Sequence, residues 1–455
     1  MLEEGKRAQT QVIVLISIVI LGSCLGNLSQ TALNAMFSGM AADFGVRMEL
    51  GQWVTTLYML VLGITVPVVT YLMRRFPLKN VVLAALLLLV IGAAIDVAAP
   101  SFEVLVAGRA LQAVSAGITM PMMISIVMTS FSRDKQATVM GITGIAMGFA
   151  PNIGPTIGGW MIGFAGWRSF FVALFVCALV LLLLAAVLIT RRPQANSSAR
   201  LDVLSLLLSA LGFGGLLLGF SNASSFGLAS PYIWVPAILG ALFLALYLRR
   251  QKHVEHPLTN LRIFDSWRYR VSFWAANALF ASFMGITLII PLFIENRWGG
   301  TALQAGLALL PGTVAAFIVN PLAGWLVDRI GARPVVVVAS VFLAVGAVSM
   351  AFIDEATPFW AIVALQGVRA TGVSGLIGPL TSWGMADLPH EIMTDGSSFG
   401  TAVRQACASV GTALMVFAIA AGASAGMSLM GFHAAFAVSG AFAVIVFGLA
   451  VARVR

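Results

Sequence analysis

Charged side chains are scarce in this chain of 455 residues. Asp, Glu, Lys and Arg together make up 9% of the residues, whereas a soluble domain carries about a quarter. Hydrophobic residues reach 60%. This composition excludes an ordinary soluble domain and predicts an all-α membrane protein, because a lone spanning segment must satisfy its own backbone hydrogen bonds.

Cysteine and histidine are also rare. The three cysteines, Cys24, Cys177 and Cys407, all lie in apolar segments, so we expect neither a disulfide framework nor a metal site. The four histidines form no cluster with Asp, Glu or Ser inside a predicted span. We therefore expect no metal, no cofactor and no enzymatic activity.

Long apolar runs are abundant instead. Each is long enough to cross the hydrocarbon core, which takes about 20 residues. We predict fourteen transmembrane spans at 11–34, 51–73, 79–99, 102–127, 136–162, 166–190, 201–221, 230–249, 271–295, 302–327, 333–353, 357–383, 397–422 and 430–452.

The positive charges are distributed unevenly between the two sides of the predicted membrane. Most of the 26 Lys and Arg residues fall on the side that carries the N-terminus. Cytoplasmic loops are enriched in these residues, so both termini are predicted to be cytoplasmic. This distribution accounts for the net charge of +9, so no nucleic-acid partner is expected and the lipid bilayer is the expected partner.

The chain contains an internal repeat. The segment "PVVTYLMRRFPLK" from Pro67 aligns without gaps with "PLAGWLVDRIGAR" from Pro321, and a second match places Arg109 opposite Arg369. Two related halves are typical of transporters. We predict one six-helix bundle over residues 1–192, a second over 251–455, and two linker helices within 193–250.

Six sequence motifs lie within or beside the predicted spans. They are "GWLVDRIGAR" (324–333), "GRALQAVSAG" (108–117), "GITGIAMGFAPNIGPTIGGW" (141–160), "QWVTTLYML" (52–60), "LQAGLALLPG" (303–312) and "VRQ" (403–405). Together they resemble the major facilitator superfamily, specifically its fourteen-helix drug:proton antiporter branch. The resemblance implies two pseudo-symmetric six-helix bundles with two extra central helices.

The resemblance also implies a function. Members of this branch export amphipathic small molecules such as drugs, dyes or lipophilic metabolites by alternating access in the bacterial plasma membrane, in exchange for protons. Gly154, Pro155 and Gly158 match the antiport motif, where small residues allow close helix packing and proline invites a bend. These three residues, together with Asp328 and Arg329 in the loop signature, are expected to act in gating.

Two positions depart from the family pattern. Ser29 stands where the first-span motif has an aspartate, and a serine does not titrate near neutral pH. Arg74 stands where the repeat places Asp328, so the first loop signature lacks its acid. A lock that uses an Asp in this first loop is not expected to form in the usual way.

A substitute for the missing first-span acid is not obvious. None of the seventeen acidic residues is predicted to lie at mid-membrane. Glu295, at the outer end of the ninth span, comes nearest, while Asp96 and Asp202 lie near other span ends. Glu295 is therefore the predicted proton-coupling candidate.

Uncharged polar residues and adaptable apolar side chains are expected to line the central cavity. Asn27, Gln30 and Asn34 share one helix face in the first span. The predicted substrate-binding or cavity residues are Gln30, Asn34, Trp53, Tyr58, Arg109, Gln112, Met123, Asn152, Phe280, Met284, Arg404 and Gln405.

Two alternatives stay open. The charges predicted inside spans are Arg109, Arg369 and Arg404. They would favour anionic groups, which suits an exporter of lipids or amphipathic anions without the usual proton-coupling acid. A non-transporting membrane sensor is the alternative of another class.

Overall fold

A computed structural model of the chain describes residues 2–46, 53–190, 202–222, 230–255 and 257–454. The regular elements among them are helices. They are α1 (Leu2–Phe44), α3 (Trp53–Thr65), α4 (Val68–Arg75), α5 (Leu78–Ala98), α6 (Phe102–Ser130), α7 (Arg133–Ala165), α8 (Trp167–Leu188), α9 (Val203–Ser221), α10 (Pro231–Gln251), α11 (Trp267–Asn296), α12 (Ala302–Ile330), α13 (Ala332–Ser349), α14 (Phe359–Met385), α15 (Met393–Ser424) and α16 (Ser428–Arg453), with short 3-10 helices η2 (Leu261–Asp265), η3 (Met350–Phe352) and η4 (His390–Ile392).

The helix count agrees with the fourteen predicted spans. Within the described residues, thirteen helices are long and apolar enough to cross a membrane, and α3 with α4 forms one further span that is bent by 47°. The bend lies between Thr65 and Val68, at Pro67. Proline lacks a backbone N–H and clashes with the preceding helical turn, so it kinks the second span at this point.

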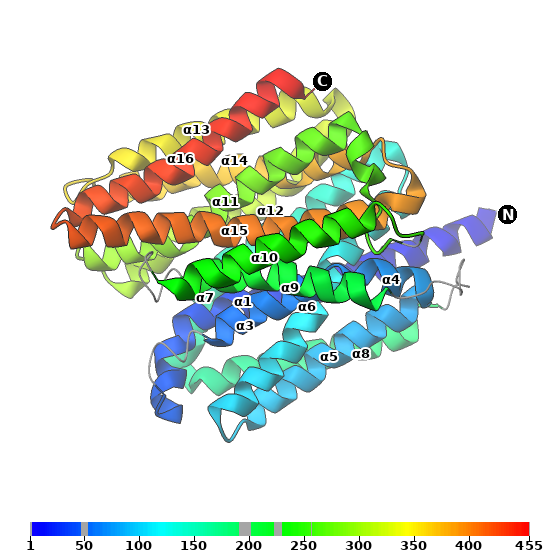
Figure 1. Cartoon of the computed structure of the whole chain (residues 1–455), viewed down its shortest axis with the longest axis horizontal. Helices are drawn as coiled ribbons and strands as arrows, with labels where there is room; N and C mark the ends of the chain where they lie inside the picture. The colour runs from blue at the N-terminus through cyan, green and yellow to red at the C-terminus, as the bar shows by residue number, and fades with distance from the viewer. Residues whose placement is uncertain (1, 47–52, 191–201, 223–229, 256, 455) are drawn as a thin grey trace.

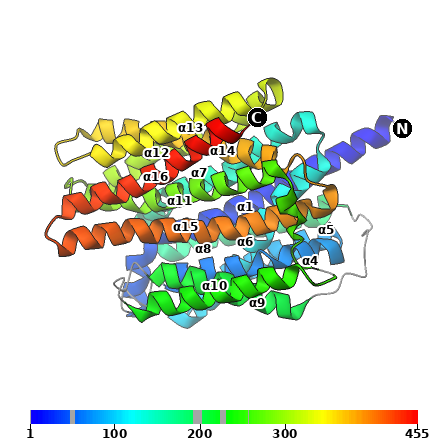
Figure 2. The same ribbon diagram turned by 45° about the horizontal axis from the view of Figure 1, so that its top comes forward.

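The helices form two groups that meet along a seam (Figure 1). The first group contains α1 and α3 to α8, the second contains α11 to α16, and the most extensive contact between them joins α7 to α12. The remaining pair, α9 and α10, packs together, and α9 contacts both α3 and α15 beside the seam (Figure 2). Both chain ends lie at one end of the bundle, which we call the terminal side; the opposite end is the distal side.

Glycines bring α7 close to one helix in each group. Gly144 lies against Asn320 of α12, whose Nδ2 donates a hydrogen bond to the Gly144 carbonyl oxygen at 3.1 Å. Gly158 lies against the carbonyl oxygen of Ala32 in α1, where a Cβ atom would have no room. The terminal-side part of α7 thus packs across the seam, whereas Gly154 and Gly158 of the antiport motif pack within the first group.

The close approach at Gly158 gives a direct prediction. A leucine there would collide with the α1 backbone, and overpacking of this kind costs about 1–3 kcal/mol. We expect Gly158→Leu to lower both the yield and the melting temperature of the purified protein. Gly163→Leu is the matched control on the same helix, because no atom lies within 4 Å of a Cβ built at Gly163. Equal losses in the two variants would contradict this account of the packing.

Candidate functional site

A buried polar cluster lies inside the first helix group, around Arg109 of α6. The Arg109 guanidinium donates hydrogen bonds to Gln112 Oε1 at 2.6 Å, to the hydroxyl of Ser29, and to the carbonyl oxygen of Ser29 at 3.0 Å. The hydroxyl of Ser29 in turn donates to Gln112 Oε1 at 2.6 Å. All three side chains are fully buried. This network ties α1 to α6 through the serine that replaces the expected acid.

Tyr58 of α3 closes one side of the cluster. The centre of the Arg109 guanidinium lies 4.3 Å from the centroid of the Tyr58 ring. The Tyr58 hydroxyl donates to the carbonyl oxygen of Gly26 in α1 at 2.8 Å. Because an aromatic face attracts a cation most strongly where water is excluded, Tyr58 stabilises the buried charge.

An acid completes the cluster from α5. Asp96 is fully buried, and its Oδ2 accepts a hydrogen bond from Gln112 Nε2 at 2.6 Å. Its Oδ1 has no hydrogen-bond partner among the described residues. Gln112 thus lies between the carboxyl group of Asp96 and the guanidinium of Arg109, and links a buried acid to a buried cation.

Sequence reasoning missed the burial of Asp96. It placed Asp96 near a span end, and the residue is indeed two positions before the end of α5 at Ala98. The residue is buried because α5 and α6 approach closely there, and a Cβ atom at Gly92 would lie 2.6 Å from the carbonyl oxygen of Gly108. Gly92 and Asp96 are four residues apart on one helix face, and this spacing was the sequence signal that could have indicated the burial of Asp96.

The earlier proton-coupling candidate lies elsewhere. Glu295 is exposed near the distal end of α11, in the second helix group. Its neighbours in the chain, Ile294 and Phe293, point into the protein core. The cluster around Arg109 belongs to the first group, so the structure does not bring Glu295 to it.

Other predicted cavity residues are distributed along α1, α6 and α7. Gln30 and Met123 are buried. Asn152 is buried at the seam, where its Nδ2 donates to the carbonyl oxygen of Gly148 at 2.6 Å. The side chains of Asn34 and Trp53 lie outside the described residues.

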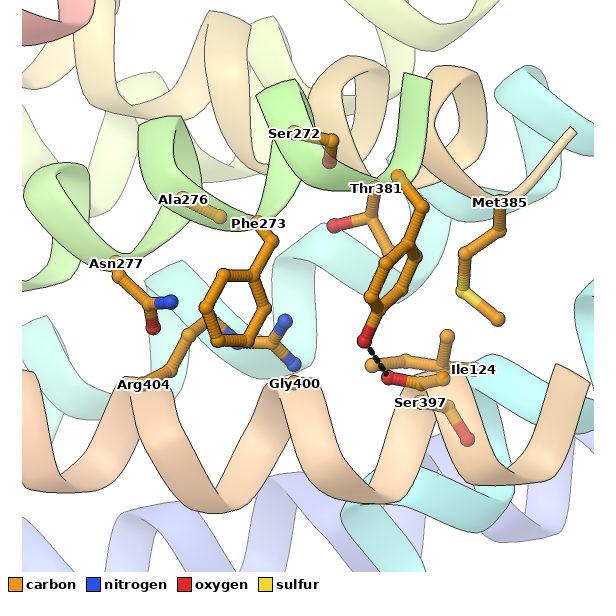
Figure 3. Close-up of a pocket in the computed structure, with 12 residues that line it drawn as sticks. Ile124, Ser272, Phe273, Ala276, Asn277, Thr381, Met385, Ser397, Gly400 and Arg404 are labelled. Carbon is orange, nitrogen blue, oxygen red and sulfur yellow. Dashed lines mark hydrogen bonds between the residues drawn. The ribbon is translucent and has the colours of Figure 1, made fainter. Parts of the chain in front are cut away.

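A small cavity lies between α11, α14 and α15 (Figure 3). Its volume is about 20 Å³, roughly the space of one water molecule. Arg404 lines it together with Asn277, whereas Phe280 is buried nearby and Met284 and Gln405 are half-buried. The full lining is Ile124, Tyr269, Ser272, Phe273, Ala276, Asn277, Thr381, Met385, Gly396, Ser397, Gly400 and Arg404.

The loop signature of the second half contacts the first half directly. Asp328 accepts hydrogen bonds from the backbone N–H groups of Ala137 at 3.2 Å and Thr138 at 2.7 Å, and from the Thr138 hydroxyl at 2.5 Å. Ala137 and Thr138 lie in the second turn of α7, so Asp328 ties the end of α12 to the terminal-side end of α7. Arg329 is exposed and lies over the Trp325 ring of its own helix, with 4.3 Å from guanidinium to ring centroid.

The loop signature of the first half also contacts the opposite helix group, but there its contact residue is an arginine instead of an acid. Arg74, at the end of α4, forms an ion pair of 2.6 Å with Asp395 of α15. Asp395 is fully buried, and its second oxygen accepts from the backbone N–H of Asn260 at 2.9 Å. The acid missing from the first loop is therefore supplied by the helix on the other side of the seam.

A third contact joins the groups on the same side. The hydroxyls of Ser125 in α6 and Thr394 in α15 lie 2.7 Å apart and share a hydrogen bond. We refer to the Asp328, Arg74–Asp395 and Ser125–Thr394 contacts as the terminal-side latch. Because all three occur near helix ends on the terminal side, the two groups are held together there.

The profile of the Major Facilitator Superfamily matches residues 19–412. The chain belongs to the Major Facilitator Superfamily. An uncharacterized MFS-type transporter of Bacillus subtilis, YcnB, is 32% identical over 441 residues, which cover 95% of this chain and 93% of the relative. The lincomycin resistance protein LmrB of the same organism is 31% identical, covering 90% of this chain and 85% of the relative.

The fold agrees with this membership in the Major Facilitator Superfamily. The crystal structure of the human organic anion transporter MFSD10 matches with a TM-score of 0.66, covering 96% of this chain and 99% of that one. At 14% sequence identity the match shows a shared fold and nothing about cargo. The resemblance drawn from the motifs is confirmed, and the chain is an integral membrane transporter rather than an enzyme.

Proposed function

We propose that this transporter exports amphipathic small molecules, drugs among them, from the bacterial cytoplasm by alternating access. The similarity to a lincomycin resistance protein over 90% of the chain supports this cargo class. The two helix groups supply the two bodies that alternating access requires. Lipid and a small-molecule substrate are the partners that this function needs.

The positive charges support an orientation with both termini in the cytoplasm. The terminal side is then the cytoplasmic side. Among the described residues, the hydrogen bonds that join the two helix groups lie in the terminal-side parts of α4, α6, α7, α12 and α15. The latch would therefore hold the cytoplasmic side closed while substrate leaves from the distal side.

Proton coupling is the second part of the proposal, and Asp96 is the residue to which we assign it. The observation that carries it is a fully buried carboxyl group linked through Gln112 to Arg109. Buried ionisable groups in transporters are costly and mark ion or proton pathways. Asp96 has this setting, whereas Glu295 is exposed to its surroundings.

The proposed function is tested by efflux from bacterial cells that express the chain, with vector-only cells as the control. The probes are lincomycin, cationic ethidium and neutral N-phenyl-1-naphthylamine. We expect lower accumulation of at least one probe in expressing cells, and a return to the vector level when a protonophore is added. Accumulation equal to the vector control for every probe would favour the membrane-sensor alternative. Export that resists the protonophore would remove the proton from the proposal.

A further inference from the structure

The second helix group contains two buried arginines without an acidic partner. Arg369 of α14 is fully buried, and its Nη1 and Nη2 atoms have no hydrogen-bond partner among the described residues. Arg404 of α15 is 8% exposed and donates to the neutral hydroxyl of Thr401 at 2.6 Å. In the described part of the chain, no Asp or Glu forms an ion pair with either arginine. A buried charge without a counter-charge is costly, so such a group is expected to have a ligand in part of the transport cycle.

Two phenylalanines of α11 connect these arginines. The Arg404 guanidinium lies 5.7 Å from the centroid of the Phe280 ring, and that of Arg369 lies 6.0 Å from the Phe283 ring. The two rings meet edge to face with centroids 6.3 Å apart. These residues occupy the middle of α11, α14 and α15, so two aromatic rings lie between two cations near the centre of the second group.

Asn277 extends the same arrangement by one helical turn from Phe280. Its side chain is 3% exposed, and neither its Nδ2 nor its Oδ1 has a hydrogen-bond partner among the described residues. Figure 3 shows Asn277 and Arg404 together at one end of the cavity, with Phe273 beside them. An amide donor and a guanidinium facing one cavity match the two oxygens of a carboxylate or sulfonate.

The first helix group has a different electrostatic character. There the charge of Arg109 is faced by Asp96 through Gln112 and by the Tyr58 ring. Positive potential without compensation is therefore concentrated in the second group, around Arg369 and Arg404. The two halves of the repeat keep an arginine at matching positions, but only Arg109 is linked to an acid by hydrogen bonds. The buried acid of the second half, Asp395, pairs with Arg74 instead.

We propose that Arg404 and Asn277 bind the acidic group of an amphipathic organic anion, with Phe280 and Phe283 against its apolar part and Arg369 adding positive potential. This inference rests on the proposed export function and names its substrate class. The cavity has room for about one water molecule, so the anion requires a wider site. Ile124 of the opposite helix group forms part of the wall, and separation of the groups at the terminal side would widen it.

The test uses two probes with the same aromatic scaffold. The anion is 1-anilinonaphthalene-8-sulfonate and the neutral probe is N-phenyl-1-naphthylamine. Transport of each is measured in proteoliposomes that contain the full chain as wild type, Arg404→Gln, Arg404→Lys or Asn277→Leu. Arg270→Gln is the control, because Arg270 is an exposed arginine on α11.

We expect Arg404→Gln to lower anion transport by about tenfold to a hundredfold, the usual effect of losing a charge-assisted hydrogen bond. Neutral-probe transport should stay near the wild-type level, and Arg404→Lys should fall between the two. Unchanged anion transport in Arg404→Gln, or equal losses for both probes, would overturn the assignment. If the wild type moves the neutral probe but not the anion, this inference fails and the export function stands. If it moves neither, this inference fails, and the export function fails with it only when lincomycin and ethidium also accumulate to the vector level in cells.

Discussion

Asp96→Asn is expected to abolish transport driven by a proton gradient while leaving the protein folded. Asparagine has the shape of aspartate, and its Oδ1 can still accept the hydrogen bond that Gln112 Nε2 now donates to Asp96 at 2.6 Å. The substitution removes the only group in this position that can take up and release a proton. Uphill transport should therefore fall to the level of protein-free liposomes, whereas exchange of substrate for substrate without a gradient should continue.

The reason lies in what surrounds the carboxyl group. Among the elements packed against α5, α6 presents Arg109, whose guanidinium stacks on Tyr58 of α3. At the end of α5, Arg168 of α8 donates to the carbonyl oxygen of Ala99 at 3.3 Å. α1 presents the neutral Ser29. In the proposed coupling, a proton on Asp96 changes the charge that balances Arg109, and Ser29 passes this change to α1.

The measurement is substrate uptake into proteoliposomes under an imposed pH gradient, with the membrane potential clamped by potassium and valinomycin. Glu295→Gln is the control, because it removes an exposed carboxylate outside the cluster. It should transport like the wild type. The reverse result, with Asp96→Asn active and Glu295→Gln inactive, would assign coupling to the residue that sequence reasoning selected.

Arg74→Glu is expected to open the terminal side of the transporter. The substitution would place a second negative charge beside Asp395, whose side chain is fully buried and now pairs with Arg74 at 2.6 Å. Removing one partner of a buried pair costs about 3–5 kcal/mol. Arg74 is 36% exposed, so solvent reduces this figure, and about 2 kcal/mol is a reasonable expectation. That is roughly a 30-fold shift in the equilibrium between closed and open states.

A graded series separates the ion pair from other effects at this position. Arg74→Lys should keep the latch, Arg74→Gln should weaken it and Arg74→Glu should weaken it most. Arg75→Glu is the matched control, since it makes the same change in net charge at the neighbouring exposed residue. If Arg75→Glu and Arg74→Glu behaved alike, the latch would not depend on the ion pair between Arg74 and Asp395.

The closed state can be followed by cross-linking. Ser125 and Thr394 lie across the seam with their hydroxyls 2.7 Å apart, so cysteines placed at both positions report whether the terminal side is shut. The background protein should lack Cys24, Cys177 and Cys407. We expect the cross-linking rate to fall along the series from Arg74→Lys to Arg74→Glu, and to stay at the wild-type value for Arg75→Glu.

At both positions that depart from the family pattern, another helix brings in the acid that the motif lacks. The first-span acid is absent at Ser29, and the structure supplies a carboxyl group from α5 at Asp96. The first-loop acid is absent at Arg74, and the structure supplies one from α15 at Asp395. In both places the charge pattern of the motif is rebuilt between helices, and the motif alone gives an incomplete account.

The sequence by itself determined the fold class, the fourteen spans, the repeat and the family. Each of these depends on local properties: the length of an apolar run, the motifs along it, and the loop residues that flank it. The bend at Pro67 also follows from a local cause. The alignment of the two halves even placed Arg109 and Arg369 at matching positions before any contact was known.

Only the tertiary structure decided which charges meet. Asp96 is two residues from the end of its helix, and its burial depends on how closely α5 approaches α6. Arg74 and Asp395 are far apart in the chain and meet across the seam. Hydropathy reports how apolar a helix is, but the rotation of that helix and its distance from its neighbours are set by packing between helices. Those two quantities determine whether a polar side chain faces an acid, an arginine or a cavity.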